Sequence, residues 1–166
     1  MAIYQQQQFV MSTLYTVCKA SGTEAEKVGT MAFSMESELW EGNTGGLDKQ
    51  AFINAAETLL SGSGFWALLA KDHTGETVGV MTLSECAALY AGGHFGEIME
   101  MYIEPEHRSA GVGAMLIDAA RDFAKSKGWP FLEVGSPEQP KWARTLSFYK
   151  RQGFREIGPR LELALW

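Results

Sequence analysis

The chain has 166 residues, of which 46% are hydrophobic and 20% are charged, and this composition is that of one globular domain spanning residues 1–166. Its formal net charge of −6 argues against nucleic acid as a partner, since a phosphate backbone needs a basic face. The N-terminus has neither the basic segment of a signal peptide nor a long apolar run, so no membrane partner is expected. Two cysteines, Cys18 and Cys86, lack metal or redox spacing, which predicts reduced thiols in a cytoplasmic protein without a metal site.

The first half of the chain predicts, in order, a strand over residues 8–17, a helix over 23–40, a second helix from 48 to 60, and paired strands over 65–71 and 77–84. Hydroxyls followed by acids at Ser21–Glu26 are typical of a helix start. Asp48 is the expected N-cap of the second helix. A short turn around Gly75 favours a hairpin between the two strands, whereas residues 86–93 give no clear prediction.

The second half predicts a strand over 95–103, a helix over 111–127, a short strand over 131–134, a helix over 141–152, and closing strands over 154–157 and 161–165. Apolar residues recur at helical spacing after Gly113, which marks an amphipathic helix. Gly111 and Gly113 leave the first backbone N–H groups of that helix uncovered, and Arg108 adds a positive charge just before them. Such a helix start is suited to an anion, and a diphosphate is the expected ligand.

Three kinds of diphosphate-binding site could begin in this way: a nucleotide-binding P-loop, a dinucleotide-binding fold and a coenzyme A site. A P-loop would need Gly-Lys-Ser/Thr, but Ala114 and Met115 follow Gly113. A dinucleotide fold would need a third glycine where the chain has Leu116, and although Glu133 lies near the distance of a ribose-binding acid, too little chain follows. The third possible ligand is the diphosphate of coenzyme A. The Arg-x-x-Gly-x-Gly sequence after a strand resembles the acyl-CoA signature of the GNAT superfamily of N-acetyltransferases.

A second segment, residues 148–154, is similar to the Phe-Tyr-x-x-x-Gly-Phe ending of GNAT domains. The resemblance implies an α/β (α+β) GNAT fold in β-α-α-β-β-β-α-β-α-β-β order, with a mixed, mostly antiparallel central sheet flanked by helices. It also implies that Tyr149 protonates the departing CoA thiolate, and an ordinary phenol pKa of about 10 suits that role. Phe148 is expected to pack in the core and to count among the cofactor-binding residues.

The strand over 95–103 carries two acids, Glu97 and Glu100. Three positions apart, they would point to opposite faces of a regular strand, although a bulge would change which one faces the cleft. A carboxylate on a covered strand is costly without a partner, so something retains both. GNAT members often use a glutamate on this strand as the general base. Counted back along the sequence from Arg108, Glu97 falls where several members carry that base. Glu97 is therefore favoured, and Glu100 stays a candidate.

The resemblance further assigns acetyl-CoA as co-substrate, held by residues Met101, Tyr102, Ile103, Arg108, Ser109, Ala110, Gly111, Val112 and Gly113. A backbone N–H near Met101 would polarise the thioester carbonyl. Many members carry an asparagine after the fifth strand to contact pantetheine. Here the loop over 135–140 offers Ser136 or Gln139 instead.

The resemblance therefore implies acetyl transfer to a primary amine in a ternary complex. Glu36, Glu38 and Glu41 could form an acidic mouth for a small cationic amine, but they could equally be a solvated helix face. Two further hypotheses are acetylation of a protein N-terminus or lysine, and a non-catalytic acyl-CoA-binding domain. GNAT domains are often dimers, so a homodimer is compatible with the resemblance.

Overall fold

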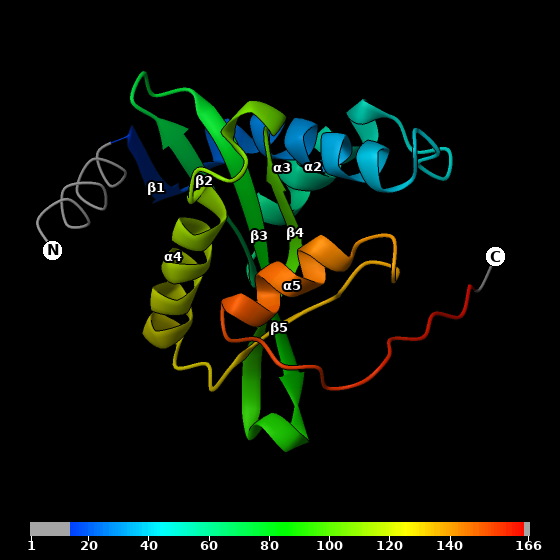
Figure 1. Cartoon of the computed structure of the whole chain (residues 1–166). Helices are drawn as coiled ribbons and strands as arrows, with labels where there is room; N and C mark the ends of the chain where they lie inside the picture. Colours follow the sequence, from blue (N-terminus) through cyan, green and yellow to red (C-terminus); the bar gives the residue numbers. More distant parts are fainter. Residues whose placement is uncertain (1–13, 165–166) are drawn as a thin grey trace, which may run out of the picture. The chain divides into compact units, whose positions relative to one another are not determined.

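The computed structural model describes residues 14–164 (Figure 1). The described chain divides into two compact units, with the boundary between Glu133 and Val134. The elements of the first unit are β1 (Tyr15–Lys19), η1 (Gly22–Glu24), α2 (Ala25–Leu39), α3 (Lys49–Ser61), β2 (Phe65–Asp72), β3 (Thr77–Ala88), η2 (Leu89–Ala91), β4 (Gly93–Ile103), η3 (Pro105–His107) and α4 (Val112–Lys127). Strand β5 (Leu132–Val134) lies at the boundary, and the second unit contains α5 (Ala143–Arg151). Along residues 14–164, no helix is long and apolar enough to cross a bilayer.

The sheet has the strand order β1-β2-β3-β4-β5. The pairs β1–β2, β2–β3 and β3–β4 are all antiparallel. This mixed architecture, a mostly antiparallel sheet flanked by helices, confirms the predicted fold class. That residues 1–166 form a single domain stays a prediction.

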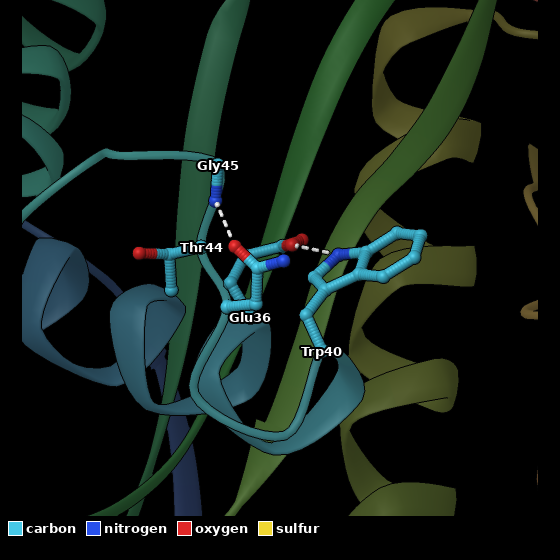
Figure 2. A pocket seen from close by; sticks show the side chains of 5 residues that line it. Glu36, Trp40, Thr44 and Gly45 are labelled. Carbon is cyan, nitrogen blue, oxygen red and sulfur yellow. Dashed lines mark hydrogen bonds between the residues drawn. The ribbon is translucent and has the colours of Figure 1, made fainter.

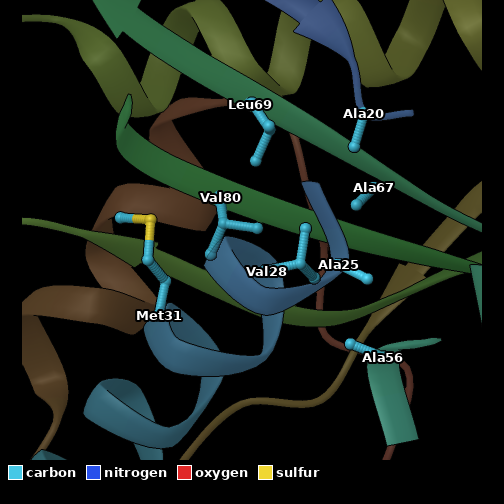
Figure 3. Close-up of a cluster of buried hydrophobic side chains, with 8 residues drawn as sticks. All are labelled: Ala20, Ala25, Val28, Met31, Ala56, Ala67, Leu69 and Val80. Carbon is cyan, nitrogen blue, oxygen red and sulfur yellow. The ribbon is translucent and has the colours of Figure 1, made fainter. Parts of the chain in front are cut away.

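Helix α2 covers one face of this sheet. Its apolar side packs on inward-facing residues of β2 and β3 in a cluster comprising Ala20, Ala25, Val28, Met31, Ala56, Ala67, Leu69 and Val80 (Figure 3). Helix α4 covers the opposite face, because a side chain at Gly79, next to Val80, would meet Leu116 and Val112 of α4 at 3.4 Å. Successive strand residues point to opposite faces, so the two helices enclose the sheet between two apolar layers.

Local sequence signals placed most element boundaries. The Asp48 side chain accepts a hydrogen bond from the Ala51 N–H at 2.8 Å, so the predicted N-cap of α3 is confirmed. Glu24 closes the start of the α2 region by accepting the Ser21 backbone N–H at 2.9 Å. Gly128, with φ +71°, ends α4 in the left-handed conformation that glycine tolerates best.

Three expectations differ from the structure. The segment with no clear prediction extends β3 to Ala88 before η2. The predicted strand over 8–17 falls partly outside the described residues, which show β1 at Tyr15–Lys19. The prediction of two closing strands is wrong over residues 154–164, which contain neither helix nor strand. Leu161 there is 92% exposed, and a strand forms only where a neighbouring strand accepts its hydrogen bonds.

Candidate active site

Strand β4 contains a β-bulge in its centre. Met81 of β3 pairs with Met101 of β4, but Leu83 pairs with Ile98, so two residues of β4 lie opposite Thr82 alone. A bulge of this kind bends the strand and changes the direction of the side chains beyond it. The register of β4 is therefore offset by one residue between its two halves.

The bulge brings Glu97 and Glu100 to the same face of the sheet. Val80 belongs to the α2 core and pairs with Tyr102, which packs against that core as well. Alternation places Glu100, two residues before Tyr102, on this face. Glu97 pairs with Ser84, four residues after Val80, and so also faces α2. The expectation that the two acids point to opposite faces was wrong, because it assumed a regular strand.

Glu100 is held by Thr82 at the bulge. The Thr82 hydroxyl donates to Oε2 of Glu100 and accepts the backbone N–H of Glu100 at 3.0 Å. Burial raises the pKa of the Glu100 carboxyl above its usual value of 4.5, the Thr82 hydrogen bond opposes that effect, and the charge of Glu36 adds to it. A carboxylate with a raised pKa is a better proton acceptor than an ordinary glutamate.

Glu97 lies deeper than Glu100, with 7% of its surface exposed. The Cys86 thiol donates to Oε2 of Glu97 at 3.6 Å, which is a weak hydrogen bond. Both predicted acids thus lie on the sheet face covered by α2, with Glu100 at the bulge and Glu97 just before it in the strand.

The turn that joins β4 to α4 has the geometry of an anion site. Gly111 is the N-cap of α4 with φ +87°, and Ser109 also has a positive φ, +61°. The first backbone hydrogen bond of the helix runs from the Met115 N–H to the Gly111 carbonyl at 3.1 Å, so the N–H groups of Val112 and Gly113 precede the ladder. These N–H groups and the helix dipole suit the diphosphate of CoA. Ala110 is half-buried within the same turn.

Arg108 lies at the surface and is bound to neighbouring residues of the protein. Its Nη1 and Nη2 donate to the two carboxylate oxygens of Glu38 in α2 at 2.9 and 2.7 Å, and its Nε donates to the Ile103 carbonyl at 2.8 Å. The guanidinium also lies 5.4 Å from the centre of the Tyr102 ring. In this arrangement Arg108 connects the turn to α2. The carboxylate of Glu38 compensates the positive charge that was expected to serve the diphosphate at the start of α4. Met101 and Ile103, near the end of β4, are half-buried.

A recess of about 320 Å³ lies at the end of α2 and in the loop after it, lined by Glu36, Trp40, Asn43, Thr44 and Gly45 (Figure 2). The Trp40 indole N–H donates to Oε2 of Glu36 at 2.7 Å. Glu36 lies close enough to Glu100 for its charge to raise the pKa of that carboxyl. Of the three acids expected at an acidic mouth, Glu36 lines this recess, Glu38 pairs with Arg108, and Glu41 is exposed.

The second unit contains the remaining predicted site residues. Tyr149 in α5 is 7% exposed, and its ring contacts Phe148 and Phe154, with both pairs of ring centres 5.5 Å apart. Burial raises the pKa of Tyr149 to about 12, which corrects the expected value of about 10. Ser136 is exposed in the loop before α5, where the Gln139 amide reaches its hydroxyl at 3.5 Å.

Two residues of the first unit were missed by sequence reasoning. Thr82 is the single hydroxyl in the apolar run over residues 78–83 of β3, and that isolated polarity was the available signal. Trp40 was considered only as the end of a helix, although its spacing of four residues from Glu36 predicts a contact on one helix face. Within residues 14–164, no group of three or more His, Cys, Asp or Glu side chains could hold a metal ion.

Comparison with known proteins identifies the family. A model of the acetyltransferase (GNAT) domain matches residues 61–156, which is more than half of the chain. The chain therefore belongs to the GNAT family of N-acetyltransferases, and the resemblance seen in its sequence is confirmed.

Two relatives and one solved structure illustrate the similarity. Aminoalkylphosphonate N-acetyltransferase of Salmonella typhimurium is 29% identical over 120 residues, 72% of this chain and 75% of the relative. An uncharacterized N-acetyltransferase of Methanocaldococcus jannaschii is 38% identical over 60 residues, 36% of this chain and 26% of the relative, so the chain spans about a quarter of that protein. Aminoglycoside N-acetyltransferase AAC(6')-Iy, solved in complex with CoA, aligns with a TM-score of 0.71 at 16% identity, over 90% of this chain and 93% of that one. The structural likeness shows a shared fold.

The raised pKa of Glu100 predicts a pH-dependent cost to stability. Because the folded protein binds the Glu100 proton more tightly than the unfolded chain does, protonated Glu100 favours the folded state at low pH. This stabilisation is lost as the pH rises from 4.5, the ordinary pKa, through the higher pKa of the folded protein. Glu100→Gln, which removes the charge, is expected to raise the free energy of unfolding at pH 8 relative to the native chain, with the gain shrinking toward pH 4.

Urea unfolding at both pH values measures this difference. Glu26→Gln is a matched control, because Glu26 is exposed on α2 and remote from the bulge. A gain from Glu100→Gln that is equal at pH 4 and pH 8 would contradict the burial of an ionisable carboxylate at this position.

Proposed function

We propose that the protein transfers an acetyl group from acetyl-CoA to a primary amine, by direct attack in a complex that holds both substrates. The observation that carries the proposal is the arrangement of β4: a carboxylate with a raised pKa lies on its bulge, and beyond its end lies a helix start whose first N–H groups precede the helical hydrogen bonds. Membership in the GNAT family supports the same reaction. The names of relatives that acetylate aminoalkylphosphonates and aminoglycosides favour a small-molecule amine as acceptor.

In this proposal, the N–H groups at residues 109–113 and the α4 dipole hold the diphosphate of acetyl-CoA, which supplies an activated acyl group as a thioester. Arg108 and Glu38 brace that turn. The backbone of Met101, Tyr102 and Ile103 is proposed to bind the pantetheine arm.

Glu100 is the proposed general base, although the sequence alone favours Glu97. An ammonium group must lose a proton before it can attack, and a base is most effective when its pKa approaches the working pH. Glu100 has the raised pKa, the fixed orientation from Thr82, and the nearby recess at Glu36. Glu97 is more enclosed, with 7% of its surface exposed, and its carboxylate contacts the Cys86 thiol.

Tyr149 is the proposed acid that returns a proton to the leaving thiolate. A phenol with a pKa of about 12 keeps its proton at every pH at which the enzyme would work. Its acidity is lower than that of an ordinary tyrosine, so proton transfer has to accompany thiolate departure rather than precede it.

Acetyl-CoA turnover with a panel of amines, followed by release of free CoA thiol, tests the reaction. With an amine that is accepted, Glu100→Gln is expected to lower kcat/KM about 100-fold at pH 7, and to remove the part of the pH profile in which native activity falls as Glu100 is protonated. Glu97→Gln is the matched comparison, with an expected loss below about tenfold.

The reverse order of these losses would assign the base to Glu97. Turnover of peptides but of no small amine would favour a protein acetyltransferase. Acetyl-CoA binding without turnover of any acceptor would contradict catalysis and favour a binding domain.

Replacement of Tyr149 tests the acid. Tyr149→Phe keeps the ring that packs on Phe148 and Phe154, and is expected to lower kcat about 100-fold while the melting temperature stays close to that of the native chain. Because the native pKa is about 12, native activity should show no loss from tyrosine ionisation up to about pH 10. An unchanged kcat, under conditions in which chemistry limits the rate, would remove Tyr149 from the mechanism.

A further inference from the structure

The recess at the end of α2 has chemistry that acetyl transfer to a simple amine does not require. Trp40 is 60% exposed, although tryptophan usually lies largely buried. Its indole is held in place by the 2.7 Å hydrogen bond to Glu36, one turn earlier on the same helix (Figure 2). The protein therefore presents an open aromatic surface beside a half-buried carboxylate.

An aromatic face beside a carboxylate is a binding site for an ammonium group. An ammonium is attracted to the face of an indole by about 0.5–1 kcal/mol when exposed and about 2 kcal/mol when desolvated. The Glu36 carboxylate can accept hydrogen bonds beyond the one from Trp40. Asn43 adds an amide oxygen, which accepts the Gly45 N–H at 3.4 Å, and none of the five lining residues is basic. A phosphonate or carboxylate on the substrate would be repelled here.

The recess is also close to the proposed base. Glu36 lies two residues before Glu38, and Glu38 is bound to Arg108 just after β4, so the recess lies on the α2 side of the sheet, as Glu100 does. The charge of Glu36 also adds to the raised pKa of Glu100. Arg108, a basic side chain bound to this part of α2, is already paired with Glu38. A substrate that brings two positive charges would compensate both acids, one at Glu100 and one at Glu36.

We propose that the Glu36–Trp40 recess binds a second ammonium group of the acceptor, so that the preferred substrates are diamines or polyamines whose reacting amine meets Glu100. This inference rests on the proposed acetyl transfer and narrows its substrate class. It distinguishes the protein from the aminoalkylphosphonate N-acetyltransferase it resembles, whose named substrate carries an anion.

The test compares α,ω-diaminoalkanes of increasing length with 1-aminoalkanes of the same length, with acetyl-CoA saturating. The diamines are expected to show kcat/KM values at least about tenfold higher than their monoamine partners, which corresponds to about 1.4 kcal/mol. The preference should peak at one chain length, because the two amines must reach two fixed sites. An aminoalkylphosphonate of similar size should be the poorest acceptor.

Variants assign the preference to the recess. Trp40→Ala and Glu36→Gln are each expected to lower the ratio of diamine to monoamine kcat/KM about tenfold, whereas Trp40→Phe keeps an aromatic face and should retain most of it. Glu26→Gln makes the same charge change at an exposed position near the start of α2 and should leave the ratio unchanged. Thermal melting of each variant checks that the fold is retained.

The outcomes separate this inference from the proposed function. Acetylation of monoamines and diamines with equal kcat/KM overturns the second ammonium site and leaves the N-acetyltransferase intact. If no amine is acetylated, the proposed function fails, and calorimetric titration of the diaminoalkanes alone then tests the recess. Binding that Trp40→Ala weakens would support it, and no binding would overturn it.

Discussion

The contact between Thr82 and Glu100 is the constraint on which the site depends. One hydroxyl donates to the Glu100 carboxylate and accepts the Glu100 backbone N–H, so it fixes the side chain and the bulge together. A hydrogen bond to a charged group contributes about 1.5–3 kcal/mol, enough to offset part of the cost of burying a carboxylate. Without the extra residue in β4, Glu97 and Glu100 would lie on opposite faces, and only one could meet a substrate beside α2.

The same strand connects the two halves of the proposed reaction. Its bulge carries the carboxylate, and its end leads through the turn at Arg108 to the N–H groups at the start of α4, which precede the first helical hydrogen bond. Glu38 of α2 binds Arg108 through both carboxylate oxygens, while Glu36 of α2 lines the recess. Because α2 contributes Glu38 to the Arg108 turn and Glu36 to the recess, a displacement of α2 would alter both proposed binding sites.

Local signals in the sequence predicted much of this fold. The Asp48 cap, the glycines around α4 and the helical spacing after Gly113 depend on neighbouring residues, and the structure confirms the elements that they predicted. The offset in β4 could not be located in this way, because it depends on which residue of β3 lies opposite Thr82. The pairing of Arg108 with Glu38 joins residues 70 positions apart, so no local pattern reveals it. The prediction of closing strands was wrong for a related reason. An alternating apolar pattern forms a strand only where the edge of a neighbouring strand is available for hydrogen bonding.

The most direct test is a crystal structure of the protein with a bisubstrate analogue, in which CoA is joined through its acetyl group to a diaminoalkane. The account predicts the diphosphate at the N–H groups of residues 109–113, the joined nitrogen within about 3 Å of the Glu100 carboxylate or one water away, and the free ammonium against Trp40. A joined nitrogen on the α4 face of the sheet, or a diphosphate bound away from this turn, would contradict it.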